Sequence, residues 1–141
     1  MAITGGCRCG AVRFTAEADP IGVRACWCRD CQYWSCGNAA VNVLFPSDKF
    51  TVTGEMTDFA SSANSGTHMH RKFCPKCGTP LLSLAESRPH ITIVRAGALD
   101  DREIAAPQGT IWAGSKPSWG HLDRDLPCTE GQPPPPPPPP T

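Results

Sequence analysis

Cysteine spacing is the feature that most constrains how this chain can fold. The 141 residues contain nine cysteines, and seven of them lie in three tight clusters. The clusters are Cys7-Arg-Cys9, Cys26-Trp-Cys28-Arg-Asp-Cys31 and Cys74-Pro-Lys-Cys77. Cysteines this close together fit the narrow geometry of a mutual disulfide poorly, and an odd number fits a closed disulfide set poorly. Because a tight turn can direct several thiolates at one point, the spacing predicts metal binding.

Zinc is the expected metal, since thiolate-rich sites select soft or borderline ions and zinc is the common one. Iron–sulfur ligation is the alternative, although its usual spacings are longer or more regular. If each cluster stays intact, only the first and third clusters together give four ligands. Two zinc ions per chain are therefore expected. The four-thiolate ion would be closed and structural, with the ligands Cys7, Cys9, Cys74 and Cys77.

The middle cluster would hold the second ion through three thiolates. A zinc ion with three protein ligands keeps one position for water or substrate, which is typical of catalytic zinc. The predicted catalytic residues are Cys26, Cys28 and Cys31. In the alternative, Cys36 lies five residues later and completes a second structural site. The ninth cysteine, Cys128, is expected to be a free thiol.

The rest of the chain predicts an all-β protein of small sheets organised around zinc knuckles, with no sustained helical period. Apolar and polar residues alternate, or β-favouring residues gather, in several short segments. The expected strands are residues 11–17, 22–26, 39–45, 50–53, 56–60, 67–73, 81–84, 90–94 and 110–112. A short helical turn is expected over residues 29–36, carrying Cys31. Metal binding would compensate for a modest core.

Composition excludes several classes of protein. Lys and Arg number 13 and Asp and Glu number 13, so there is no basic surplus to neutralise a nucleic-acid backbone. No apolar run approaches the roughly 18 to 20 residues of a membrane span. The first residues lack the charged and apolar regions of a signal peptide. These observations predict a cytoplasmic protein that binds neither nucleic acid nor membrane.

Proline marks the expected domain boundary. Residues 133–140 are eight consecutive prolines, which cannot join a sheet because proline has no N–H. We expect a polyproline II rod, either inert or a ligand for a proline-recognising domain. The predicted organisation is a zinc-binding domain over residues 1–131 and a disordered proline-rich tail over residues 132–141.

Five ordered motifs resemble the glutathione-dependent formaldehyde-activating family, which includes the centromere protein V domain. The first is Gly5-Gly6-Cys7-x-Cys9-Gly10 followed by Val12-Arg13-Phe14, and the second is the Cys26 cluster. The others are Phe73-Cys74-x-x-Cys77-Gly78-Thr79-Pro80-Leu81, Ala96-Gly97-x-Leu99-Asp100-Asp101, and Ile111-Trp112 with Lys116-Pro117-x-Trp119. The resemblance runs from about residue 4 to about residue 122.

The resemblance implies an all-β fold with two zinc sites. It assigns the same four cysteines to the structural zinc and the same three to the catalytic zinc as the number of ligands per cluster does. It also implies carbon–sulfur lyase chemistry, with S-hydroxymethylglutathione formed from glutathione and formaldehyde. A substrate thiol would bind at the open three-cysteine zinc as a thiolate. The chain departs from the family at two positions. Trp27 stands where members usually have His, and Gln32 stands where they often have Arg.

Other polar residues are weaker candidates. His68 and His70 would share one face of a strand, as proton relays or as ordinary surface histidines. Asp30 could be a base or could support a zinc ligand. The basic residues that could meet the carboxylates of a glutathione-like ligand are Arg29, Arg71 and Lys72. Trp27 and Trp34 are expected to wall the pocket or to pack under the knuckle, and Trp112 and Trp119 to lie in the core.

The leading hypothesis is a zinc-dependent carbon–sulfur lyase acting on a thiol–aldehyde adduct. Three alternative functions remain, and each predicts a different observation. A carrier would bind glutathione or another thiol without speeding the chemistry. A structural zinc module for protein or nucleic-acid interaction would show a fourth protein ligand at the second metal. A thiol redox enzyme would cycle Cys26 and Cys28. The sequence leaves the oligomeric state open.

Overall fold

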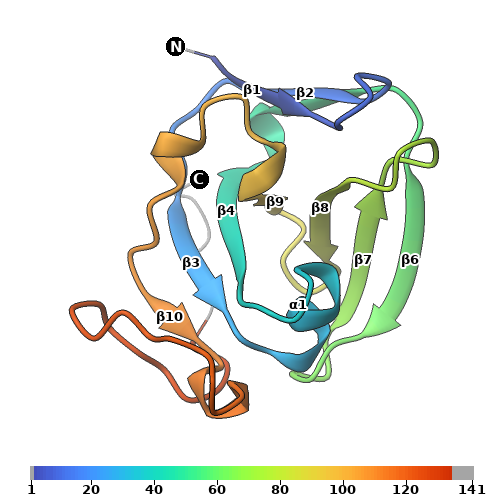
Figure 1. The fold of residues 1–141 in the computed structure, drawn as a ribbon. Helices are drawn as coiled ribbons and strands as arrows, with labels where there is room; N and C mark the ends of the chain where they lie inside the picture. Colours follow the sequence, from blue (N-terminus) through green and yellow to red (C-terminus); the bar gives the residue numbers. More distant parts are fainter. Residues whose placement is uncertain (1, 135–141) are drawn as a thin grey trace.

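The computed structural model describes residues 2–134 and is mostly β-structure, as the sequence predicts (Figure 1). In this part of the chain, ten strands form one sheet of three strands and one of seven. The strand ranges expected from the sequence correspond to nine of the observed strands, with ends that differ by up to two residues. The all-β prediction is therefore confirmed.

The smaller sheet has the order β1 (Ile3–Gly6), β2 (Arg13–Ala16) and β5 (Phe50–Thr53), with antiparallel neighbours. It lies across the top of the molecule in Figure 1. Phe14 of β2 stacks on Phe50 of β5 with ring centroids 5.1 Å apart. This aromatic contact turns the inner face of the small sheet into part of the main core.

The sequence did not predict β1, because its segment contains Gly5 and Gly6 and glycine weakens a strand. The structure gives the reason for Gly5. A Cβ at that position would lie 2.3 Å from both the Ala98 carbonyl oxygen and the Phe14 ring. The glycine therefore allows the close approach of β1 to the core, and backbone pairing with β2 supplies the strand.

The larger sheet carries the features on which the candidate site depends. Its strands, in spatial order, are β10 (Thr110–Ile111), β3 (Gly22–Cys26), β4 (Ala40–Pro46), β9 (Ile91–Arg95), β8 (Pro80–Ala85), β7 (His68–Phe73) and β6 (Thr57–Ser62). All neighbours are antiparallel except β10 and β3, which are parallel.

Alternation along the central strands gives this sheet two different faces. Val23, Val43 and Val94 are directly paired across β3, β4 and β9, and all three are buried in the main core. One residue away, Arg24, Asn42 and Arg95 form the next paired row. Because successive side chains point to opposite faces, the arginines lie on the face away from the main core.

Short helices connect the strands. The helix α1 (Arg29–Trp34) follows β3 directly, as predicted, and in Figure 1 it lies beside the lower end of β4. Four 3-10 turns supply the other corners. They are η1 (Ser47–Lys49), η2 (Ala96–Ala98), η3 (Arg102–Ala105) and η4 (Ala113–Ser115). No helix among residues 2–134 is long and apolar enough to cross a membrane.

After η4 the chain returns to run beside β10. The Thr110 N–H donates to the Pro127 carbonyl oxygen at 2.9 Å, and the Trp112 N–H donates to the Gly131 carbonyl oxygen at 3.2 Å. The predicted tail, residues 132–141, lies mostly outside the described residues, which end at 134. The division into a domain and a proline-rich tail stays a prediction.

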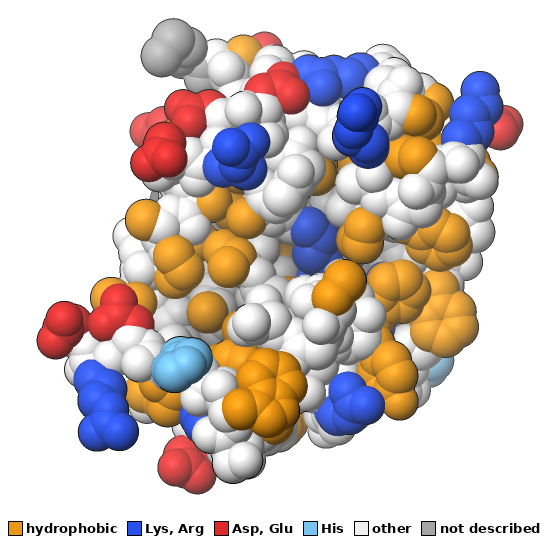
Figure 2. Space-filling model, viewed as in Figure 1, with side chains coloured by type: hydrophobic (Ala, Val, Ile, Leu, Met, Phe, Trp, Pro, Cys, Tyr) orange, Lys and Arg blue, Asp and Glu red, His pale blue; other side chains and the backbone are white. Residues whose placement is uncertain are grey.

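Charges on the face of the molecule seen in Figure 2 are mixed. Lys and Arg side chains are scattered between Asp and Glu side chains on this face and do not gather into one basic surface. This arrangement agrees with the balanced count of basic and acidic residues. Trp119, which was expected in the core, is 62% exposed, so that expectation was wrong.

Candidate functional site

Two groups of cysteines come together among the described residues. None of the nine cysteines forms a disulfide. Within each group all Sγ atoms lie within 4.8 Å of one another. The first group is Cys7, Cys9, Cys74 and Cys77, and the second is Cys26, Cys28 and Cys31. The chain is therefore folded so that the seven clustered cysteines divide into four and three.

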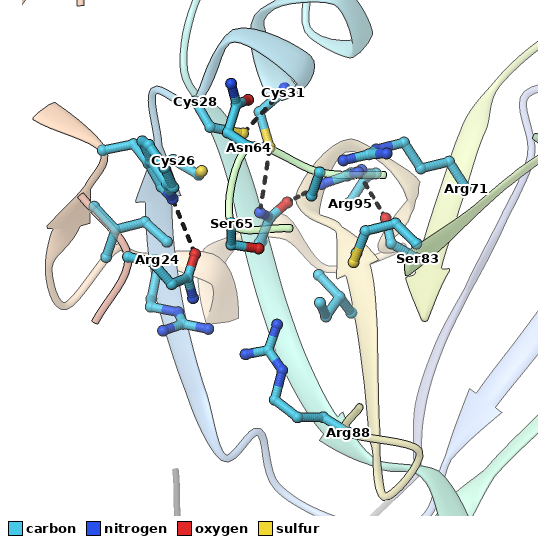
Figure 3. Close-up of a pocket in the computed structure, with 17 residues that line it drawn as sticks. Arg24, Cys26, Cys28, Cys31, Asn64, Ser65, Arg71, Ser83, Arg88 and Arg95 are labelled. Carbon is cyan, nitrogen blue, oxygen red and sulfur yellow. Dashed lines mark hydrogen bonds between the residues drawn. The ribbon is translucent and has the colours of Figure 1, made fainter. Parts of the chain in front are cut away.

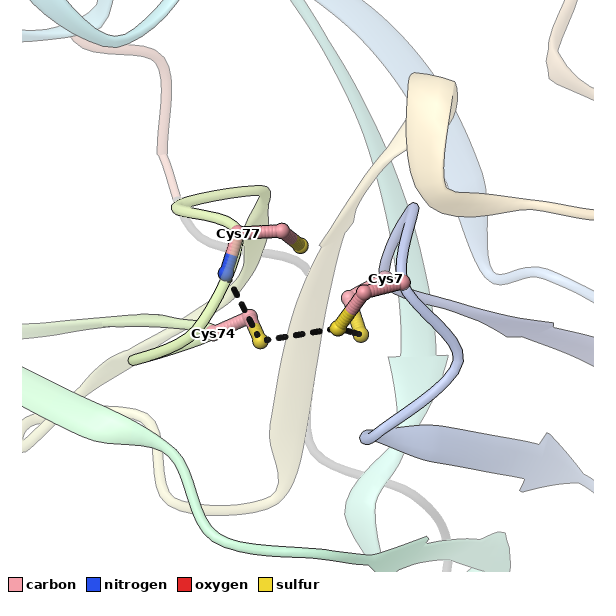
Figure 4. A group of neighbouring side chains, drawn as sticks. Cys7, Cys74 and Cys77 are labelled. Carbon is pink, nitrogen blue, oxygen red and sulfur yellow. Dashed lines mark hydrogen bonds between the residues drawn. The ribbon is translucent and has the colours of Figure 1, made fainter.

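The four-cysteine group joins the turn after β1 to the turn after β7 (Figure 4). Cys7 and Cys74 are buried, whereas Cys9 and Cys77 are exposed. The Cys7 and Cys9 sulfurs are 3.6 Å apart, and those of Cys9 and Cys74 are 3.7 Å apart. Four sulfurs at about 2.3 Å from a zinc ion would be about 3.8 Å from one another. The spacing of this group therefore fits a tetrahedral zinc ion.

Backbone N–H groups point at these sulfurs. The Val12 N–H donates to Cys7 Sγ at 3.2 Å, and the Lys76 N–H donates to Cys74 Sγ at 3.4 Å. Gly78 ends the second turn at a φ of +77°, which glycine adopts without strain. Hydrogen bonds from Thr79, from its side chain first and then its backbone, lower the pKa of Cys77 to about 5. These donors favour thiolates, which are the form that binds metal.

The three-cysteine group is built where β3 meets α1. Cys26 is the last residue of β3, Cys28 is the N-cap of α1, and Cys31 lies in its first turn. The Cys31 N–H donates to Cys28 Sγ at 3.3 Å. All three are buried, with exposed fractions of 4 to 7%. A sharp strand-to-helix turn thus collects three sulfurs from six consecutive residues.

The electrostatics of this group favour one stable thiolate. Hydrogen bonds from Cys26 and then Cys28, together with the Arg95 charge, lower the pKa of Cys31 to about 2. Asn42 Nδ2 lies 4.0 Å from Cys31 Sγ, and this weak contact also lowers the pKa of Cys31. Contacts with Cys28 and Cys31 raise the pKa of Cys26 above its usual value. A cation bound among the sulfurs would compensate the further negative charges.

The three cysteines open onto a pocket on the face of the larger sheet that lies away from the main core (Figure 3). The pocket has a cavity volume of about 60 Å³ and is partly open to solvent. Its apolar walls include Met69, Ile93, Ile111 and Trp112. Asn64 and Ser65, from the turn between β6 and β7, close one side.

Four arginines line the same pocket: Arg24, Arg71, Arg88 and Arg95. Arg95 donates through Nη1 to the side-chain oxygen of Asn42, its cross-strand partner. Through Nη2 it donates to Ser83 Oγ at 2.7 Å. These two hydrogen bonds hold the guanidinium against the sheet, close enough to Cys31 to stabilise its thiolate.

Arg71 is the most buried of the four, with a side chain only 6% exposed. Its Nη1 donates to Ser61 Oγ at 3.0 Å, and its Nη2 lies 3.8 Å from Asp30 Oδ2 of α1. Its Nε is buried and has no hydrogen-bond partner among the described residues. An unfilled buried donor is costly, so a ligand acceptor in this pocket would relieve that cost.

The two departures from the resembled family do not line this pocket. Trp27 is buried at 2% exposure and approaches Gly120 and its neighbour Lys116. Gln32 is also buried, and its Nε2 donates to the carbonyl oxygens of Trp27 and Ser115 at 2.8 and 3.0 Å. Both side chains therefore fasten α1 to the segment around η4, away from the pocket wall.

Other sequence candidates are dispersed. Cys36 and Cys128 are exposed and belong to neither cysteine group. Arg29 stacks over the Tyr33 ring at 4.2 Å, and neither Arg29 nor Lys72 lines the pocket. His70 contacts the carboxylates of Asp58 and Glu86 at 2.7 and 2.9 Å, on the surface.

Sequence reasoning identified Arg71 but missed three of the four arginines. Arg24, Arg88 and Arg95 are far apart in the chain and carry no local motif. Strand pairing places Arg24 and Arg95 in one row through Asn42. An Arg within an otherwise largely apolar strand, as in residues 22–26 and 91–95, was the available signal.

Comparisons with known proteins give a consistent result. Residues 2–115 match the family model described as glutathione-dependent formaldehyde-activating enzyme. A Halomonas elongata protein, named "Putative glutathione-dependent formaldehyde-activating enzyme", is 27% identical over 129 residues, which cover 87% of this chain and 82% of that protein. A Rhodobacter sphaeroides protein of known crystal structure has a similar fold, with a TM-score of 0.57 and 20% identity, over 74% of this chain and 96% of that one.

Proposed function

The chain belongs to the glutathione-dependent formaldehyde-activating enzyme family, and on that premise we propose that it makes or breaks the carbon–sulfur bond of a thiol–aldehyde adduct. Glutathione and formaldehyde, which the family name specifies, are the first pair to test. Their adduct is S-hydroxymethylglutathione, and the activity would be that of a carbon–sulfur lyase. The reduced thiols that such a site requires fit a cytoplasmic location.

One observation carries this proposal: three buried cysteines face a pocket, and no fourth cysteine of residues 2–134 joins them. A closed structural zinc site needs four protein ligands, whereas three leave one position for a substrate atom. The exposed position of Cys36, outside the group, supports the open site over the alternative of a second structural zinc.

We propose that zinc is held by both cysteine groups. Cys7, Cys9, Cys74 and Cys77 would hold a structural ion, and Cys26, Cys28 and Cys31 a catalytic one. When bound at the open site, zinc keeps a coordinated substrate thiol in its thiolate form near neutral pH. The family's name and the thiolate-only ligand set both fit zinc.

The protein groups around the pocket would orient the reaction. The Arg95 guanidinium, fixed by Asn42 and Ser83, places positive charge beside the cysteines. The free Nε–H of Arg71 is a donor for the oxygen that becomes negative as sulfur attacks the carbonyl carbon. Apolar walls such as Met69 and Ile93 would limit water at the reacting carbon.

The proposed step balances without an oxidant or reductant. The thiolate sulfur forms a bond to the aldehyde carbon while the carbonyl π bond breaks. The oxygen takes the electron pair and then a proton from solvent, which gives a hemithioacetal. The reverse sequence releases thiol and aldehyde, so the same residues serve both directions.

The test compares adduct formation with and without the zinc-loaded protein, because thiols and aldehydes also add spontaneously. Exchange between free and adduct formaldehyde, followed by NMR with glutathione, should be faster with the protein. Cys28→Ser should lose this acceleration and one zinc ion per chain while keeping its fold. Cys128→Ser, which changes an exposed cysteine outside both groups, is the matched control.

Two results would contradict the proposal. Cys28→Ser protein with one zinc per chain and full acceleration would exclude the open site as the centre of the reaction. Tight thiol binding without any acceleration by the unchanged protein would favour a carrier.

A further inference from the structure

The pocket beside the three cysteines has an unbalanced charge. Four arginines line it, and none of its lining residues is Asp or Glu. Figure 3 shows Arg88 on the opposite side of the pocket from Cys28 and Cys31, with Arg24 below Cys26. Positive groups thus stand at both ends of the space in which a ligand would lie.

Two of the positive charges have an evident partner. Arg71 lies 3.8 Å from the Asp30 carboxylate. Arg95 is held by the neutral groups of Asn42 and Ser83, but it faces Cys31. Three thiolates around one divalent cation carry a net charge of −1, so the cysteine centre would offset the Arg95 charge.

Arg24 and Arg88 are the pair that remains. Among the described residues, neither forms an ion pair with a carboxylate. Both are partly buried, and both line the same pocket. Half-buried arginines that repel one another and lack an anion are unfavourable unless a ligand supplies the anion.

We propose that the natural ligand of this pocket carries two carboxylates and no ammonium group, with the carboxylates bound by Arg24 and Arg88. Guanidinium groups bind carboxylates through paired hydrogen bonds. These bonds are strong, and their fixed geometry favours a carboxylate over other groups. The inference rests on the proposed function for its reacting atom, which is the ligand's thiol sulfur. It goes beyond that function in naming the charge of the ligand.

Glutathione fits this pocket less well than such a dicarboxylate. Its two carboxylates are accompanied by an α-ammonium group, and no Asp or Glu lines the pocket to receive that charge. A cation placed beside the unpaired Arg24 and Arg88 would be repelled. A compact thiol such as mercaptosuccinate has both carboxylates and no ammonium, and therefore matches the unpaired arginines.

The test measures dissociation constants by titration calorimetry on the zinc-loaded full chain. The probes are mercaptosuccinate, glutathione, the neutral thiol 2-mercaptoethanol and the thiol-free dianion succinate. We expect mercaptosuccinate to bind at least about tenfold more tightly than 2-mercaptoethanol or glutathione, since a charged hydrogen bond contributes at least that factor. Added salt should weaken binding of the dianionic thiol and leave binding of the neutral thiol unchanged.

Variants separate a charge effect from a folding effect. Arg24→Gln and Arg88→Gln should each weaken mercaptosuccinate binding about tenfold or more relative to 2-mercaptoethanol binding. Arg88→Lys should recover part of the affinity, because it restores charge without the paired donors. Arg102→Gln, which removes an exposed arginine of η3, is the control and should have no effect. The ratio of the two affinities within one folded variant is independent of small stability changes.

The outcomes distinguish the two proposals. Equal affinities for neutral and dianionic thiols, or tightest binding of glutathione, would overturn the charge inference and leave the thiol chemistry standing. Binding of succinate without binding of any thiol would support the charge inference and contradict the proposed function. Full mercaptosuccinate affinity in both glutamine variants would also overturn the role of Arg24 and Arg88.

Discussion

The indole N–H of Trp112 donates a hydrogen bond of 2.9 Å to Oε1 of Gln132, twenty residues later in the chain. Both side chains line the pocket. Trp112 has a φ of +56°, in the left-handed region that costs a non-glycine residue about 1 to 3 kcal/mol. The backbone strain and this hydrogen bond together fix the indole as a pocket wall.

Gln132→Ala should therefore open one wall without unfolding the protein. Because the residue is exposed, we expect the free energy of unfolding to change by less than about 1 kcal/mol. The dissociation constant of the pocket ligand should rise several-fold, since the indole loses its acceptor. Urea unfolding and calorimetry measure the two quantities separately. An unchanged dissociation constant would exclude Gln132 from the wall.

The two cysteine groups should respond differently to mutation. Cys74 is completely buried and links distant turns, so Cys74→Ser should lose one zinc and more than about 3 kcal/mol of stability. Cys28→Ser should lose one zinc with a smaller stability loss, because its group lies within one local turn. Metal analysis and thermal unfolding test this order. A larger loss for Cys28→Ser would reverse the structural and catalytic roles.

Arg95 should not be replaceable by lysine. Arg95→Lys keeps the charge but cannot hold Asn42 and Ser83 at once, so it would leave buried polar groups unpaired. We expect a loss of about 1 to 3 kcal/mol in the free energy of unfolding. Arg102→Lys on the surface should change it by less than about 0.5 kcal/mol. Equal stability of both variants would contradict a positioning role for Arg95.

His70 should contribute stability at low pH. Glu86 first, and Asp58 second, raise its pKa above the usual value of about 6.5. The stabilisation from the charged imidazole is therefore fully present below the pKa that His70 has in the unfolded chain. It is lost as the pH rises through the higher pKa that His70 has in the folded protein. The stability difference between the unchanged protein and His70→Gln should be larger at pH 5.5 than at pH 8.5.

His68→Gln is the matched control for this pH dependence. His68 lies two residues earlier on β7 and forms no ion pair among the described residues. His68→Gln keeps both ion pairs of His70, so the stabilisation that they supply at low pH should remain. A His70 difference that stays constant from pH 5.5 to 8.5 would show that the two carboxylates do not stabilise the charged imidazole.

The sequence predicts the cysteine division because each cluster is local and only the first and third clusters together give four ligands. The segment 22–26 illustrates the same point for the fold, since its β-favouring residues and the cysteine that ends it are visible without any partner. By contrast, the pairing of Arg24 with Asn42 and of Asn42 with Arg95 depends on strand register. Register is set by tertiary packing, and a shift of one residue would send the arginines to the opposite face.

Aromatic positions show the same limit. Both residues are tryptophans, yet Trp27 is 2% exposed and Trp119 is 62% exposed. Burial of Trp27 depends on the approach of Gly120, ninety-three residues away. Gln32 directly follows Cys31 in the sequence, but its side chain turns toward two backbone carbonyls and away from the pocket.

The wall formed by Gln132 also affects how this pocket can evolve. The cysteines and arginines lie within residues 2–115, which match the family model, whereas Gln132 lies beyond them. Substitutions in the segment beside β10 could alter which ligands enter while the buried cysteine centre stays unchanged. Mutations at this exposed position could thus change the preferred substrate while every intermediate variant keeps its metal site.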